Sequence, residues 1–447
     1  MSARRRTGPA VRRALLGALL PLVLLAGAGC ATDPPEPRAA ARDGAVDPAG
    51  RPVTLTVGVF GAFGLKEAGL YDAYMRLHPG IAVRQSSIER NENYYPQLLT
   101  HLVTGSGLAD VQAVEVGNIA EVVATQGGRL LDLGAVPGVD RAAFLPWKWA
   151  QGTGRDGRTV ALGTDIGPQA VCYRKDLFAR AGLPTGRAAV ARLWAGNWRR
   201  FLAAGRRFAA RAPRGTAFTD SASGVLAAAT GSAAVRFYDE RGALVVDRNP
   251  AVRDAWDLAA SFAREGLTAR LQQFTPGWDQ GFANGAFATV ACPAWMLGYI
   301  EDKAGPAGRG RWDVAAAPRP GAWGGSFLVV PAAGPHRTEA ARLAAWLTAP
   351  AQQARLFARR GSFPSASAAY RLPAVADARH PYFGDAPVGR IFAGAALGVP
   401  RAPVGPKDGL IAQHLADLGM LQVDQAGRDP DGAWRAALRS IDNALDR

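Results

Sequence analysis

Along the body of the chain, the pattern of polar and apolar residues alternates between the period of two of a β-strand and the period of about 3.6 of an α-helix. Residues 53–60 alternate with a period of two and are rich in β-branched side chains, which predicts a strand. Residues 66–78 have helical spacing, and residues 81–86 are extended again. Residues 95–104 place their leucines on one side of a second helix. The predicted order is therefore strand, helix, strand, helix.

The same alternation continues through the rest of the body. Residues 110–116 predict another strand, and such alternating units indicate an α/β fold whose mostly parallel sheets are flanked by helices. About 400 residues exceed what one core organises, so we expect two domains. Strands at 157–163 and 170–174 flank a predicted first crossing between them, and the glycine-rich stretch 321–325 is the predicted return crossing. Four aromatic residues at helical spacing indicate core: Trp194, Trp198, Phe201 and Phe208.

The first thirty residues have the layout of an export signal. Five arginines precede the charge-free segment 14–29, which is shorter than the about 20 apolar residues that span a bilayer. The segment ends at Cys30 after small residues and resembles the bacterial lipobox, with Gly27 where that motif usually has Leu. We expect a signal peptide over 1–29, lipidation of Cys30 and a lipid-attached flexible tether over 30–52. Cleavage at an Ala-x-Ala-like site and an uncleaved anchor are the alternatives.

The positive charge of the chain is dispersed. The net charge is +15, and it falls to +10 when residues 1–29 and their five arginines are removed. Only five of the 52 basic residues are lysines, and no dense basic run follows the signal. Nucleic acid is therefore not an expected partner, and an arginine bias of a GC-rich genome accounts for the charge.

The patterns of common catalytic and metal sites do not occur. The histidines are far apart and none has a metal-ligand spacing: His78, His101, His336, His380 and His414. No nucleophile elbow, phosphate-binding loop or dinucleotide fingerprint stands in a supporting context. A glycosidase needs two carboxylates about 5–10 Å apart, and Glu115, Asp165 and Asp279 are the only candidates that we identify. We expect no catalytic residue, no metal and no cofactor.

Several segments carry a family resemblance. Residues 157–184, with the pattern Tyr-Arg-Lys-Asp-Leu, resemble the crossing segment of family 1 extracellular solute-binding proteins, the maltose-binding class. Residues 282–295 are similar to the strand of that family that ends in tryptophan, with Thr289 in place of Met. Residues 324–331 and the helix pair at 340–357 fit as well. The resemblance covers nearly the whole chain after the signal.

The resemblance implies a two-lobe α/β fold of the class II periplasmic-binding-protein type. Its first lobe would comprise residues 53–165 and 322–368, and its second lobe residues 166–321 and 369–447. A mono- or oligosaccharide would bind in the interlobe cleft, and the lobes would close around it by a hinge motion.

The same resemblance implies a place and a set of partners. The protein would be a monomeric lipoprotein on the extracellular face of the cytoplasmic membrane, where it delivers its ligand to the permease subunits of an ABC importer. The alternatives are a binder of another solute, such as a polyamine or an amino-acid derivative, and a cell-surface glycoside hydrolase.

A sugar presents apolar C–H faces and a rim of hydroxyl groups, so its site needs aromatic rings and hydrogen-bonding side chains. The loop tryptophans Trp278, Trp295 and Trp323 are the candidate stacking residues. The candidate partners of the hydroxyl groups are polar residues near strand ends and crossings: Glu115, Asn118, Asp165, Gln169 and Asp279. Core packing for the tryptophans, and turn or cap roles for the polar residues, are the alternatives.

Two cysteines remain once Cys30 is assigned to lipid. Cys172 and Cys292 lie in the two segments with the strongest family resemblance, and an exported protein meets an oxidising environment. We predict a disulfide between them; two buried free thiols are the alternative.

Overall fold

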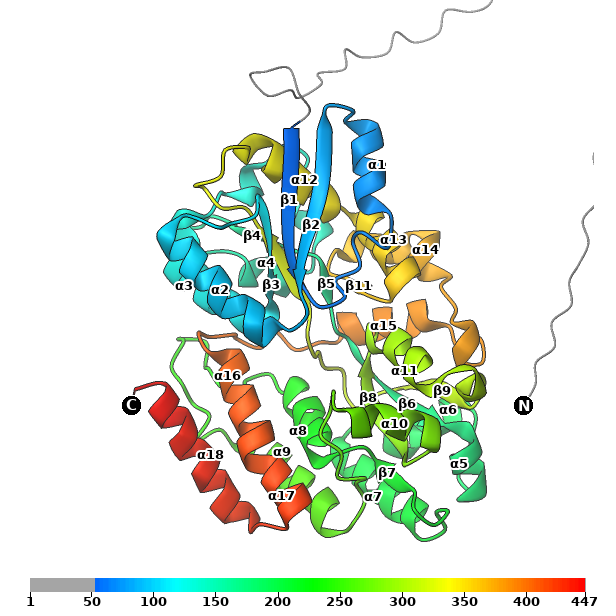
Figure 1. Cartoon of the computed structure of the whole chain (residues 1–447). Helices are drawn as coiled ribbons and strands as arrows, with labels where there is room; N and C mark the ends of the chain where they lie inside the picture. Colours follow the sequence, from blue (N-terminus) through cyan, green and yellow to red (C-terminus); the bar gives the residue numbers. More distant parts are fainter. Residues whose placement is uncertain (1–52, 447) are drawn as a thin grey trace, which may run out of the picture. The chain divides into compact units, whose positions relative to one another are not determined.

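The structure is a computed structural model that describes residues 53–446 (Figure 1). The expected signal peptide, the lipidation of Cys30 and the tether at 30–52 lie outside the described residues. Within residues 53–446, no helix has both the length and the apolar character needed to cross a membrane.

The first sheet has five strands in the order β2-β1-β3-β10-β4. Their bounds are β2 Ile81–Ile88, β1 Val53–Phe60, β3 Val111–Glu115, β10 Ser326–Val329 and β4 Ala161–Gly163. Strand β1 pairs in parallel with β2 and β3, whereas β10 runs antiparallel to both β3 and β4. The sheet thus combines the N-terminal part of the chain with a strand from far along it. We call this sheet and its helices lobe 1.

Alternate residues of β10 face two different cores, as the period of a strand requires. Leu328 packs into one core cluster, and Phe327 and Val329 pack into another. The helices on the Leu328 side include α1 Leu70–Leu77, α12 Arg337–Leu347 and part of α13 Pro350–Arg360. The helices on the Phe327 side are α2 Asn91–Thr104 and α3 Val116–Gln126. The short helix α4 Pro146–Gln151 lies next to β4.

The second sheet has four strands in the order β7-β8-β6-β9, and we call it and its helices lobe 2. The strand bounds are β7 Ala217–Thr219, β8 Phe287–Pro293, β6 Gln169–Arg174 and β9 Trp312–Ala316. The helices between these strands are α5 Lys175–Arg180, α6 Arg187–Trp194, α7 Trp198–Ala209, α8 Ala222–Gly231, α9 Pro250–Arg264, α10 Pro276–Asn284 and α11 Met296–Ala304. Further helices follow later in the chain: α14 Pro373–Ala376, α15 Val388–Leu397, α16 Asp408–Gln413, the π-helix His414–Met420, α17 Leu421–Ala426 and α18 Pro430–Ala444. The four aromatic residues predicted as core between 194 and 208 are buried in this lobe, as expected.

Both sheets are mixed, which differs from the expected mostly parallel arrangement. In lobe 2, β6 runs antiparallel to β8 and β9, and only β7 and β8 are parallel. The physical reason is that the chain leaves lobe 1 after β4 and returns into it through β10. Because the outgoing and returning strands lie side by side in each sheet, they must run in opposite directions.

A disulfide joins Cys172 in β6 to Cys292 in β8, as the sequence predicted. The two Cα atoms are 5.7 Å apart, and both residues are fully buried on one face of the lobe 2 sheet. The bond closes a sequence separation of 120 residues. It therefore ties together the strands that carry Gln169 and lead to Trp295.

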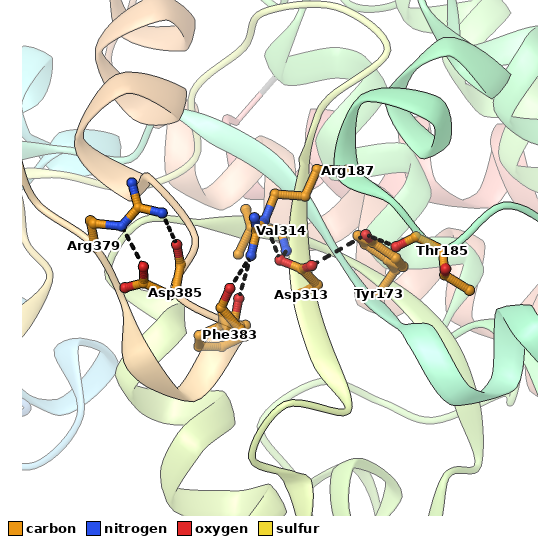
Figure 2. Close-up of polar contacts among 9 residues, drawn as sticks. Tyr173, Thr185, Arg187, Asp313, Val314, Arg379, Phe383 and Asp385 are labelled. Atoms are coloured by element: carbon orange, nitrogen blue, oxygen red, sulfur yellow. Dashed lines mark hydrogen bonds and ion pairs between the residues drawn. The ribbon is translucent and has the colours of Figure 1, made fainter.

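A polar network holds a later segment against the sheet of lobe 2, and Figure 2 shows it. Arg187 Nε donates to Asp313 Oδ1 at 2.6 Å, and its Nη2 donates to the carbonyl oxygen of Phe383 at 2.9 Å. Tyr173 donates its hydroxyl to the carbonyl oxygen of Thr185 at 2.7 Å. Burial raises the pKa of the Asp313 carboxyl, and the Arg187 guanidinium opposes that rise. These contacts fix the chain near residue 383 against β9.

The disulfide is expected to contribute substantially to stability. The double variant C172A/C292A should unfold with a free energy lower by about 4–5 kcal/mol, because a bond closing a long loop restricts the unfolded chain. Urea unfolding of the two proteins, with and without a reducing agent, measures this difference. Reduction should destabilise the wild type alone. An unfolding midpoint of the wild type that reduction does not change would contradict this expectation.

Candidate functional site

The two crossings between the lobes run side by side. Trp323 N–H donates to the carbonyl oxygen of Gly167 at 2.8 Å, and Gln169 N–H donates to that of Gly321 at 2.9 Å. A Cβ atom at residue 167 would collide with the Trp323 carbonyl oxygen, so this approach requires glycine. Gly325 has a φ of 115°, which also favours glycine. The close pair of crossings sets the positions of the side chains around it.

The return crossing brings two carboxylates to its sides. Ser326 N–H donates to Asp165 Oδ1 at 2.9 Å, while Ser326 also pairs with Glu115 across the sheet. Glu115 caps α3 by accepting from the Gly117 N–H at 2.5 Å. Burial raises the pKa of the Glu115 carboxyl to about 7, and burial also raises that of Asp165. Two predicted polar residues from distant segments therefore flank one strand end.

Lys148 of α4 places a buried ammonium group beside these carboxylates. The residue is 1% exposed, and its Nζ lies 3.6 Å from the centroid of the Phe327 ring. Among residues 53–446, Nζ has no hydrogen-bond partner. Burial lowers the pKa of Lys148 to about 7, and the charges of Asp165 and Glu115 oppose that change.

Sequence reasoning did not select Lys148. A signal was available, since it stands between Trp147 and Trp149 in an apolar stretch where an exposed lysine is unexpected.

The C-terminal part of lobe 2 contacts lobe 1 at α3. Asp408, at the start of α16, is 4% exposed and accepts from Arg236 Nη2 at 3.1 Å. Its neighbour Lys407 forms an ion pair with Glu121 of α3. The N-terminal turn of α3 touches the backbone at Gly409. Contacts between α3 and α16 therefore join the two lobes on this side.

We call the two crossings at residues 164–169 and 321–326, together with the contact between α3 and α16, the junction of the lobes. Several buried polar atoms without a hydrogen-bond partner lie near it. Within the described part of the chain, those that lie near the crossings, α3 or α16 are Lys148 Nζ, Asn91 Oδ1, both amide atoms of Gln169, Arg236 Nε, Asp408 Oδ1 and His414 Nδ1. An unpaired buried polar group costs about 1–3 kcal/mol, so such a cluster requires an explanation. A ligand with several hydrogen-bonding groups would satisfy it.

Aromatic side chains lie next to these polar groups. Trp295 Nε1 donates to the carbonyl oxygen of Trp323 at 3.2 Å, and the two ring centroids are 5.6 Å apart. Both tryptophans are partly exposed. Phe274 lies 6.0 Å from the Trp323 ring and is 49% exposed, and the sequence reasoning did not select it. Its position in a polar loop before a helix was an available signal.

The predicted site residues separate into two groups. Five of them surround the junction, and Asn118 joins them by accepting from Asn91 Nδ2 at 2.9 Å. The five are Glu115, Asp165, Gln169, Trp295 and Trp323. Trp278 is fully buried and donates to Asp220 Oδ2 at 2.9 Å, so it offers no open ring face in this structure. Asp279 is engaged within lobe 2 by Tyr299 and by Lys303 at 3.4 Å.

A hollow lies within lobe 1, away from the two crossings. It has a volume of about 530 Å³ and is lined by residues that include Asp132, Arg141 and Thr159. Asp132 already accepts from the backbone N–H groups of Gly134 and Thr159. In residues 53–446, none of the buried polar side-chain atoms that lack a hydrogen-bond partner belongs to a residue that lines this hollow. In the part of the chain that the structure describes, no group of three or more His, Cys, Asp or Glu side chains is placed to hold a metal ion.

Comparisons with known proteins agree with this architecture. The family model described as bacterial extracellular solute-binding protein matches residues 69–382. A solved structure described as an extracellular solute-binding protein of family 1 has 41% sequence identity and a TM-score of 0.79, and the match covers 88% of this chain and 100% of that chain. No curated protein matches the sequence. The expected two-lobe α/β class is confirmed.

Two more distant structures were solved with sugars. The ABC-transporter-associated binding protein of B. animalis subsp. lactis, in complex with β-1,6-galactobiose, has 20% identity and a TM-score of 0.70, and the match covers 88% of this chain and 98% of that one. The GacH receptor of Streptomyces glaucescens, solved without ligand and with acarbose, has 18% identity and a TM-score of 0.70, with coverage of 88% and 99%. At these identities the likeness shows the fold alone.

The buried ammonium of Lys148 should leave a signature in the pH dependence of stability. Its folded pKa of about 7 lies below the ordinary value of 10.5, so between these values the unfolded chain binds a proton that the folded chain lacks. The wild type should therefore gain stability relative to K148M as pH rises from 7.5 to 9, by up to about 1.4 kcal/mol per pH unit.

Urea unfolding of wild type and K148M at several pH values measures this difference. The variant K66M, which removes an exposed lysine, is the control. Parallel pH profiles for wild type and K148M would show that Lys148 is not a buried cation with a lowered pKa.

Proposed function

Because the chain belongs to the bacterial extracellular solute-binding family, we propose that it is the binding component of an ABC importer and holds a mono- or oligosaccharide at the junction of its lobes. The observation that carries this proposal is that the unpaired buried polar atoms of Lys148 and Gln169 and the partly exposed rings of Trp295 and Trp323 all lie at one pair of crossings. A pyranose matches both, since it combines an apolar C–H face with a rim of hydroxyl groups.

Each group has a role in the proposed site. Trp295 and Trp323 stack on sugar rings, and the carboxylates of Glu115 and Asp165 accept hydrogen bonds from sugar hydroxyl groups. The unpaired amide of Gln169 both donates and accepts. Asn118 and Asp408 provide further acceptors, whereas Trp278 supports the site from within the core. Sugar complexes of proteins with the same fold support this choice of ligand.

The way the lobes are joined supports a hinge at the crossings. In this proposal lobe 1 comprises residues 53–165 and 322–368, and lobe 2 comprises residues 166–321 and 369–447. One hydrophobic cluster passes through the crossing side, because it contains Leu145 and Phe363 together with residues of the lobe 2 sheet. The side of α3 and α16 is instead held by the ion pair of Lys407 with Glu121. Separating an ion pair exposes less apolar surface than separating a hydrophobic cluster does, so the lobes open on the α3 side. A ligand that contacts both lobes favours the closed state.

Export, anchoring and delivery complete the proposal. Residues 1–29 act as the signal peptide, Cys30 carries the lipid, and the protein works as a monomer at the outer surface of the membrane beside its permease. Binding occurs without catalysis.

A solute with ammonium groups, such as a polyamine, is the second candidate, because three carboxylates surround the junction: Glu115, Asp165 and Asp408. The buried ammonium of Lys148 among them favours the sugar.

The proposal is tested by thermal unfolding of residues 31–447 against a panel of mono- and oligosaccharides. A ligand that binds only the folded state at 100 times its Kd adds about 2.7 kcal/mol of stability. One sugar series should raise the Tm, and W295A should bind it at least about tenfold more weakly, which corresponds to about 1.4 kcal/mol.

The matched control is W346A, which removes a partly buried tryptophan that packs on Tyr74, away from the junction. Its affinity should equal that of the wild type. A folded protein whose Tm no sugar raises would refute the saccharide, and polyamines and chromogenic glycosides are then the next compounds to assay. Unchanged affinity in W295A would remove that residue from the site.

A further inference from the structure

Phe274 combines two unfavourable features in one residue. Its backbone has a φ of 62°, a left-handed conformation that a residue with a bulky side chain seldom adopts. Its ring is 49% exposed, which makes it one of the large apolar side chains that remain open to solvent. Strain and exposure that persist together in a folded protein point to a use for the exposed group.

The buried residue Asp220 forms hydrogen bonds with residues on both sides of Phe274, through its carboxylate to two side chains and through its backbone carbonyl to one backbone N–H. Asp220 is 1% exposed, and its Oδ2 accepts from Gln273 Nε2 at 2.8 Å and from Trp278 Nε1 at 2.9 Å. Its carbonyl oxygen accepts from the Leu271 N–H at 3.2 Å. These bonds fix the residues before and after Phe274. The left-handed conformation of Phe274 is therefore maintained by hydrogen bonds on both sides of it.

The ring of Phe274 extends the aromatic surface of the junction. Its centroid lies 6.0 Å from that of Trp323 and 6.3 Å from that of Trp295, and it is inclined by only 24° to the Trp295 ring. Trp323 is in turn two residues from Gly325, where Asp165 and Lys148 meet the return crossing.

The loop that carries Phe274 also faces lobe 1. Its Gln272 hydrogen bonds with Asp417 on the π-helix His414–Met420, and burial, together with the charge of Glu92 on α2, raises the pKa of the Asp417 carboxyl. Phe274 thus stands between the crossing and the place where the lobes face each other.

We propose that Phe274 is a third stacking ring of the saccharide site, that it packs on the C–H face of a hexopyranose, and that Asp220 is the residue that positions it. This inference rests on the proposed function. The competing role for Phe274 is a cover over the buried Trp278 ring, whose centroid is 5.1 Å away.

The test measures the affinity of the full chain for the saccharide that gives the largest thermal shift, by titration calorimetry. F274A should bind at least about tenfold more weakly, and F274Y, which keeps a flat ring, should bind within about twofold of the wild type. F274L keeps apolar cover but lacks a flat ring, so it should resemble F274A. The control L397A removes a side chain that is 68% exposed on α15, and its affinity should not change.

A double-mutant cycle tests the role of Asp220. If Asp220 acts through Phe274, D220N should weaken binding in the wild type and have no further effect in F274A. Additive effects of the two changes would overturn the positioning role. The Tm of each variant without ligand checks that it is folded.

The remaining outcomes are distinct. If the wild type binds sugar and the F274A and F274L variants bind it with the same affinity, Phe274 serves only as a cover for Trp278. A folded wild type that binds no sugar would overturn the proposed function and the stacking role with it, and this result appears before any variant is compared.

Discussion

The close passage of two chain segments between the lobes is the constraint on which the rest of the structure depends. The hydrogen bond from the Trp323 N–H to the Gly167 carbonyl is possible only because residue 167 has no side chain. This approach fixes where β10 enters the lobe 1 sheet. Strand β10 then brings Asp165 and Glu115 to one strand end and leaves Trp323 beside Trp295.

Buried charged groups at the junction lower the stability of the folded protein when they have no polar partner. Lys148 is held in a low-dielectric position, where burial lowers its pKa, while burial raises that of Glu115. Such groups reduce the stability of a protein unless hydrogen bonds or opposite charges satisfy them. Proteins retain them where binding requires unpaired donors and acceptors that are already in position. The crossing side of the lobes, in contrast, is closed by apolar packing around Phe363.

Parts of the proposed site could be predicted from the sequence because they follow local rules. A polar residue at a strand end, such as Glu115, and a tryptophan in a glycine-rich crossing, such as Trp323, are visible in a short window of residues. Trp278 shows the limit of that reasoning. It follows a Pro-Gly pair as an exposed loop residue would, yet Asp220, which is 58 residues away, provides the partner that allows its indole to be buried. The position of Lys148 between two tryptophans was a local signal of burial, but the two carboxylates whose charges act on it come from other segments.

The sequence predicted the alternation of strands and helices up to the first crossing, two α/β units, the places of both crossings and a disulfide between Cys172 and Cys292. These features depend on the periodicity of side chains, on turn residues and on a family resemblance. The mixed direction of the strands and the contact of α16 with α3 became visible in the tertiary structure. It alone placed Phe274 beside Trp323. Pairing direction and side-chain neighbours depend on which distant segments share a core. That arrangement minimises the apolar surface exposed to water over the whole chain, which no short window of residues reveals.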